Sequence, residues 1–129
     1  MPGRSAAARG RDVRLQLLSA AATLVAEMGW NAVSTRTLAE RAGVTPGLVH
    51  YHFPSLQALL RDAALGMMSD LLSSAEALFE TARTLDAGVD LLLSSLNAYT
   101  GSDPTSLLFI ETYLAATRDE TLRSELVAV

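Results

Sequence analysis

A chain of 129 residues, half of them hydrophobic, is long enough for one domain and part of a second, and its net charge is −4. The absence of cysteine excludes disulfides and thiolate metal sites, and no apolar run is long enough to span a membrane. The polar N-terminus lacks the apolar segment of a secretory signal, so we expect a cytoplasmic protein. We also expect no cofactor.

The charge is distributed unevenly along the chain. Residues 1–60 carry six arginines and three acids, a net of +3, whereas residues 61–129 carry four arginines and eleven acids, a net of −7. A basic half suits a polyanion such as a phosphate backbone. For residues 1–10 we expect no regular structure, which leaves a DNA-binding arm and a solvated tail as equal alternatives. The arginines at the start of the chain are Arg4, Arg9, Arg11 and Arg14.

The first long helix is predicted over residues 12–28. Apolar residues recur there at the spacing of one helix face, and Gly29 ends the pattern. Trp30 follows in the connection to the next helix. We expect it to fill a corner of the core, as aromatic residues between helices commonly do.

Two short helices joined by a tight turn are predicted next, over residues 35–42 and 46–52. Ser34 can cap the first helix, and Gly43 ends it because glycine enters the left-handed region without steric cost. Pro46 suits the first position of the second helix, where no N–H is needed. A helix, a glycine-containing turn and a second helix form the DNA-binding helix-turn-helix arrangement.

Residues 33–53, VSTRTLAERAGVTPGLVHYHF, closely resemble the DNA-binding signature of TetR-family transcriptional repressors. The resemblance covers about residues 11–60 at the level of motifs, and beyond them only helix order and length. It implies a three-helix DNA-binding domain (1–54) followed by a helical ligand-binding and dimerisation domain (55–129). It also implies a repressor that leaves a palindromic DNA operator when it binds a small hydrophobic effector.

A recognition helix places its N-terminal residues near base edges in the major groove, with Val49 and Phe53 expected to face the core. The resemblance implies a phosphate contact at His50, and in some relatives an arginine at the position of Arg36 reads guanine. Where relatives commonly carry a phosphate-binding lysine, this chain has Leu56, so one ionic contact per half-site is missing. The predicted DNA-binding residues are Ser34, Thr35, Arg36, Thr45, Pro46, Gly47, Leu48, His50, Tyr51 and Ser55.

The second half is predicted to be helical over residues 55–82, 87–100, 105–117 and from Asp119 onward, with a break at 84–86. Asp103 and Pro104 are a suitable N-cap and first residue of the third of these helices. The last helix ends within about three turns. A TetR-type chain would continue into two helices that pair across a two-fold axis. We therefore expect an incomplete bundle, and a homodimer formed through helices that are not present in this chain.

Aromatic, methionine and polar residues are scattered through these helices, and each of them singly fits a bundle core. The resemblance implies a small-molecule cavity instead, and the scarcity of charge on the apolar faces favours an uncharged or amphipathic hydrophobic ligand. The predicted ligand-binding residues are Met67, Met68, Phe79, Asn97, Tyr99, Phe109, Thr112 and Tyr113.

Two other classes of function, an enzyme and a protein-interaction module, fit the sequence less well. The sequence has no Ser/His/Asp set and no glycine-rich phosphate loop, so we expect no enzymatic activity. His50 and His52 diverge by about 200° around a helix, so we expect no metal site there. A helical interaction module that binds a protein partner through its acidic half remains the alternative, but it leaves the pattern of residues 43–53 unexplained.

Overall fold

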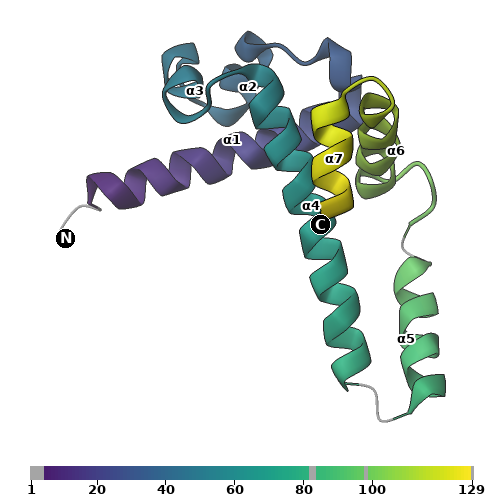
Figure 1. Cartoon of the computed structure of the whole chain (residues 1–129). Helices are drawn as coiled ribbons and strands as arrows, with labels where there is room; N and C mark the ends of the chain where they lie inside the picture. Colours follow the sequence, from purple (N-terminus) through teal and green to yellow (C-terminus); the bar gives the residue numbers. More distant parts are fainter. Residues whose placement is uncertain (1–4, 82–83, 98, 129) are drawn as a thin grey trace. The chain divides into compact units, whose positions relative to one another are not determined.

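The computed structural model describes residues 5–81, 84–97 and 99–128, and every regular element within these ranges is a helix (Figure 1). The prediction of an all-α fold is confirmed. None of the described helices combines the length and the apolarity needed to cross a membrane. The elements are α1 (Ala6–Met28), the 3-10 turn η1 (Trp30–Ala32), α2 (Thr35–Ala42), α3 (Pro46–His52), α4 (Leu56–Thr81), α5 (Leu85–Leu96), α6 (Pro104–Ala116) and α7 (Glu120–Ala128).

The chain divides into two compact units, Met1–Ala63 and Ala64–Val129. The division falls inside α4, so one continuous helix belongs to both units. The boundary predicted after residue 54 lies near the start of that helix and stays a prediction.

The first helix starts earlier than its predicted residue 12. Ser5 caps α1, because its Oγ accepts a hydrogen bond of 3.1 Å from the amide of Ala8. Residues 6–11 read AAARGR, and alanine and arginine are strong helix formers. The expectation that the chain start lacks regular structure is therefore wrong for residues 6–10.

The core of the first unit is built from the apolar faces of its helices. Leu17 of α1, Leu38 of α2, Val49 of α3 and Leu59 of α4 are all buried. Because α2 and α3 have only 8 and 7 residues, they would be unstable as isolated helices and depend on this burial. Trp30 is 5% exposed and fills a core corner, as predicted. Its Nε1 donates to Gln57 Oε1 at 3.1 Å.

In the second unit, α5 begins where the sequence pattern predicted a break. The Thr84 hydroxyl oxygen accepts the amide of Ala87 at 3.1 Å, so Leu85 and Asp86 form the first turn. The acidic side chain of Asp86 suits a helix N-terminus. The helix ends at Leu96, so Tyr99, predicted inside it, lies beyond it. Asp103 caps α6 and Pro104 is its first residue, as predicted.

Two leucines of α1 provide a test of the core. Leu17 is fully buried, whereas Leu15 is 64% exposed. We expect Leu17→Ala to lower the free energy of unfolding of the first unit by about 2–5 kcal/mol, because it removes buried methyl groups and leaves a cavity. Leu15→Ala should change it by less than about 0.5 kcal/mol. Urea unfolding followed by the fluorescence of Trp30, the only tryptophan, measures both; equal losses would contradict this core.

The N-cap of α6 predicts a dependence of stability on pH. The hydrogen bond from the Ser106 hydroxyl, 2.6 Å from Oδ1, and bonds from the amides of Ser106 and Thr100 lower the pKa of Asp103 to about 2. Because the pKa of Asp103 is lower in the folded state than in the unfolded state, its ionised carboxylate stabilises the fold at pH values above the unfolded-state pKa. This stabilisation is lost as the pH falls toward 2.

Thermal melts followed by circular dichroism test this cap. Asp103→Asn should have a lower Tm than the parent chain at pH 6, and the gap should shrink by pH 3, because Asp103 is then largely protonated in the unfolded parent chain. Asp90→Asn, which removes one exposed charge from α5, controls for net charge. A gap that is constant between the two pH values would contradict the role given to Asp103.

Candidate functional site

The turn between α2 and α3 is fixed by hydrogen bonds at both ends of α2. At the start, Ser34 Oγ accepts the Thr37 amide at 3.1 Å and Thr37 Oγ1 accepts the Ser34 amide at 3.0 Å, which is a reciprocal capping box. At the end, Gly43 lies in the left-handed region (φ 74°, ψ 30°). The Val44 amide donates to Ala39 O at 3.0 Å, which closes a Schellman turn. The sequence prediction for Ser34 and Gly43 is confirmed.

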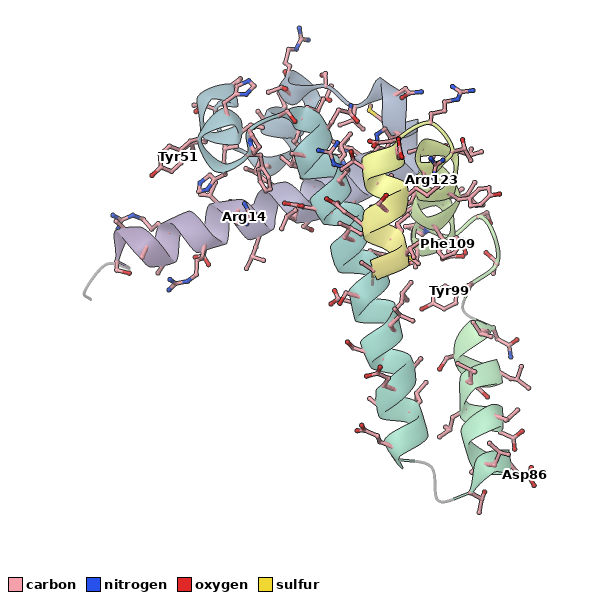
Figure 2. The ribbon with its side chains drawn as sticks, viewed as in Figure 1. Arg14, Tyr51, Asp86, Tyr99, Phe109 and Arg123 are labelled. Carbon is pink, nitrogen blue, oxygen red and sulfur yellow. The ribbon has the colours of Figure 1, made fainter. Side chains whose placement is uncertain are left out.

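The helix α3 has one buried and one exposed face. Val49 and Phe53 are 1% and 2% exposed, so both face the core as predicted. Leu48 and His50 are exposed, and Tyr51 is 81% exposed and extends away from the helix (Figure 2). The outer face of this seven-residue helix thus carries the apolar side chain of Leu48 beside the side chains of His50 and Tyr51.

The first turn of α3 is also exposed. Thr45 occupies the N-cap position but its side chain makes no capping bond, and Pro46 is the first helical residue. A Cβ built on Gly47 would meet nothing nearer than the hydroxyl oxygen of Thr45 at 3.9 Å. Packing inside the chain therefore does not require glycine at position 47.

The start of α2 and the start of α4 hold the other predicted contacts. Arg36 is largely exposed and its Nε lies 3.4 Å from Glu40 Oε1. An exposed pair four residues apart on a helix is weak, so Arg36 can leave it at little cost. Thr35 is half-buried, and Ser55 caps α4 through a 3.1 Å hydrogen bond from the Ala58 amide to its Oγ.

Arg14 joins three helices of the first unit, a role that sequence reasoning missed. Its Cζ lies 4.3 Å from the ring centroid of Phe53, its Nη1 donates to His52 O at 3.2 Å, and its Nη2 lies 3.2 Å from Asp62 Oδ2 (Figure 2). No local pattern could reveal these contacts, because the partners are 38 and 48 residues away. Arg14 therefore ties α1 to the end of α3 and to the first turns of α4.

A second ion pair holds α2 on α1. Arg41 Nη1 and Nη2 donate to the two carboxylate oxygens of Glu27 at 3.0 and 2.7 Å. This bidentate hydrogen bond lowers the pKa of Glu27 and raises that of Arg41. The spacing of 14 residues again places it beyond any sequence periodicity.

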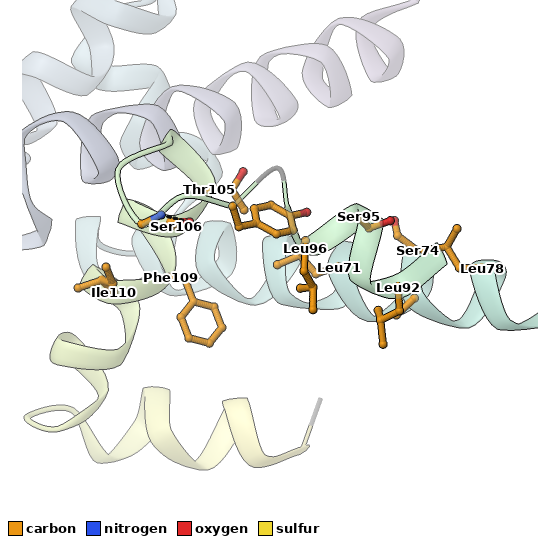
Figure 3. Close-up of a pocket in the computed structure, with 13 residues that line it drawn as sticks. Leu71, Ser74, Leu78, Leu92, Ser95, Leu96, Thr105, Ser106, Phe109 and Ile110 are labelled. Carbon is orange, nitrogen blue, oxygen red and sulfur yellow. Dashed lines mark hydrogen bonds between the residues drawn. The ribbon is translucent and has the colours of Figure 1, made fainter. Parts of the chain in front are cut away.

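The second unit contains a groove of about 570 Å³ between α4, α5 and α6 (Figure 3). Its walls are mainly leucine, alanine, isoleucine and aromatic side chains, and its polar side chains all carry hydroxyl groups. Among the described residues that line the groove, none has a charged side chain. These lining residues are Leu71, Ser74, Ala75, Leu78, Leu92, Ser95, Leu96, Tyr99, Gly101, Thr105, Ser106, Phe109 and Ile110.

Of the eight predicted ligand-binding residues, Tyr99 and Phe109 line this groove. Thr112 is 3% exposed, and its hydroxyl donates to Leu108 O at 2.7 Å inside α6. Tyr113 lines a separate, shallower hollow beside α7.

The remaining predicted ligand-binding residues do not line the groove or cannot be placed in it. Met67 and Met68 are half-buried earlier in α4, and Asn97 ends α5 exposed. The side chain of Phe79 lies outside the described part of the chain. Sequence reasoning missed the serines of the groove, although Ser74 and Ser95 lie among leucines of amphipathic helices, which was the available signal.

Most of the first unit matches a known family model. Residues 17–63 match the family model described as bacterial regulatory proteins, tetR family. These residues run from the second half of α1 to the first turns of α4 and include the whole helix-turn-helix.

Two characterised relatives are similar to this chain. The HTH-type transcriptional repressor KstR2 of Rhodococcus jostii (strain RHA1) is 38% identical over 58 residues, which cover 45% of this chain and 28% of KstR2. The HTH-type transcriptional regulator BetI of Rhizobium meliloti (strain 1021) is 30% identical over 115 residues, which cover 88% of this chain and 57% of BetI. The chain therefore matches only about half or less of the length of these relatives.

Two solved structures extend the likeness beyond the first unit. The protein SCO7518 of Streptomyces coelicolor A3(2) is 27% identical with a TM-score of 0.77, over 88% of this chain and 66% of SCO7518. The multidrug binding protein EbrR, solved with imidazole, is 30% identical with a TM-score of 0.63, over 89% of this chain and 65% of EbrR. The helix-turn-helix of this chain is therefore similar to that of the tetR family of bacterial regulatory proteins, and the likeness to the two solved structures extends through the second unit.

Proposed function

We propose that this chain is part of a cytoplasmic, ligand-responsive regulator that binds a specific DNA sequence and represses transcription. The observation that carries the proposal is the exposed face of α3. A buried Val49 and Phe53 hold the helix down while Leu48, His50 and Tyr51 face outward. A short helix held this way fits a major groove, where its side chains reach base edges.

The residues around α3 support this assignment. Gly47 is not required by internal packing, but it permits a backbone to approach DNA closely. Arg36, held only by an exposed pair with Glu40, can turn toward guanine or phosphate. The relative KstR2 is a repressor, which favours repression over activation.

The groove of the second unit supports a small-molecule effector. A volume of about 570 Å³ lies within the range of drug-sized ligand sites. A wall of apolar groups and hydroxyls favours a neutral ligand, because a charged one would lose its hydration without gaining a partner of opposite sign. The relative EbrR is a multidrug binding protein, which is compatible with a hydrophobic effector here.

The proposed mechanism is a shift between two conformations of a homodimer. Two recognition helices about 34–36 Å apart would fit successive major grooves of a palindromic operator. An effector that binds more tightly to a conformation with a different spacing would lower operator affinity. The size of this decrease is limited by the ratio of the effector's affinities for the two conformations. The helix α4 is suited to carry this coupling, because its later turns line the groove and its first turns belong to the DNA-binding unit.

The DNA-binding face is tested by fluorescence anisotropy with the full-length protein. The two duplexes are the DNA upstream of its own gene and a shuffled control. We expect tighter binding to the upstream duplex and a loss of about tenfold or more in Tyr51→Ala and Arg36→Ala, as for lost base or phosphate contacts. Tyr113→Ala, an exposed tyrosine of the second unit, should bind as the parent protein does.

Loss on the upstream duplex alone would identify a base contact, whereas equal loss on both duplexes would identify a phosphate contact. Parent-like affinity in both Tyr51→Ala and Arg36→Ala would show that this face is not the DNA-binding face. No binding of the parent protein to either duplex at low salt would favour the protein-interaction alternative.

The groove is tested with the neutral hydrophobic dye Nile red and the cationic dye rhodamine 6G. We expect the full-length protein to bind Nile red more tightly and to lose at least about tenfold in Leu96→Asp, because the change places a charge in an apolar groove. Leu72→Asp, at a leucine of similar exposure outside the groove lining, should keep parent affinity. Equal effects of the two variants, or preference for the cation, would contradict the proposed site.

A further inference from the structure

The start of α1 lies outside the region that the family model matches. The match begins at residue 17, whereas α1 begins at Ala6 with a capped first turn. The intervening helical turns carry Arg9, Arg11 and Arg14 against a single acid, Asp12. They form a basic N-terminal extension of α1 that precedes the residues matched by the family model.

This extension is attached to the end of the recognition helix. A Cβ built on Gly10 would lie 3.8 Å from His52 Cε1, so the backbone of α1 passes close to the last residue of α3. One turn further on, Arg14 donates to His52 O and covers the ring of Phe53. The start of α1 is therefore held in a fixed position relative to α3 within the first unit, unlike a flexible tail.

The arginines of the extension differ in their surroundings. Arg14 is committed to Asp62, His52 and Phe53. Arg11 is exposed, and within the described residues it has neither an ion-pair nor a hydrogen-bond partner for its guanidinium. Because successive residues turn by about 100° around a helix, Arg11 lies to one side of the stripe through Gly10 and Arg14 that faces α3.

The geometry of a docked recognition helix places phosphates near this position. The major groove is about 12 Å wide, and α3 with its 7 residues is only about 10 Å long at 1.5 Å per residue. When the N-terminal residues of α3 lie at base edges, its C-terminal end lies toward the edge of the groove, where the phosphates are. The start of α1 passes that end of α3.

We propose that the N-terminal extension of α1 is a second DNA-contacting element, in which Arg11 binds a backbone phosphate beside the groove occupied by α3. The proposal rests on the DNA-binding function proposed above. The contact is electrostatic and reads no base, so it raises affinity for every sequence and lengthens the DNA that one half-site requires.

The test compares Arg11→Ala, Arg11→Lys and Arg118→Ala in the full-length protein. The probe is the upstream duplex, titrated by anisotropy between 50 and 200 mM NaCl. Arg118 is an exposed arginine of the second unit, so its removal changes net charge equally. We expect Arg11→Ala to reduce the slope of log K against log salt by about 0.9 per protomer, with Arg11→Lys and Arg118→Ala keeping the parent slope.

A second readout is the length of DNA that is needed. When the duplex ends are trimmed stepwise, the affinity of the parent protein should fall at the length that removes the phosphate bound by Arg11. The affinity of Arg11→Ala should not change at that step. A parent-like slope and trimming response in Arg11→Ala, with DNA binding intact, would overturn this inference and leave the proposed function standing. Absence of DNA binding by the parent protein would overturn both.

Discussion

The helix-turn-helix of this chain depends on the burial of a few apolar side chains, because its two helices are too short to be stable by themselves. Leu38 and Val49 each contribute one buried face to a core that α1 and the first turns of α4 complete. The Schellman turn at Gly43 sets where α2 ends, and the ion pair of Arg41 with Glu27 holds α2 on α1. The exposed face of α3 is thus held in position by side chains that would not themselves contact DNA.

Most of the first unit could be predicted from its sequence. The bounds of α2 and α3 follow from local signals, since Ser34, Gly43 and Pro46 act through bonds within one turn. Composition alone does not predict the start of α1, because glycine and arginine near a chain end are typical of disorder, whereas the helix propensity of three alanines and the Ser5 cap favour a helix from residue 6. The Arg14 contacts were beyond prediction, because they join residues far apart in the sequence.

The second unit was harder to predict, and the reason is chemical. Its helices are apolar over wide faces, so periodicity did not separate core from groove. Residue type alone predicts Thr112 as a polar ligand contact, but its hydroxyl donates to the carbonyl of Leu108 inside its own helix. Ser74 and Ser95 line the groove instead. Where a hydroxyl points depends on packing between helices, which local sequence does not encode.

The polar side chains described in the groove lining all carry hydroxyl groups, and this affects how ligand binding would depend on salt. A neutral molecule held by apolar walls and hydroxyls gains nothing from counterions, so ionic strength would barely alter its affinity. DNA held through arginine side chains would weaken steeply with salt. In the proposed regulator, a change in salt concentration would therefore alter the fraction of operator that is bound, while the effector concentration that causes release would stay almost constant.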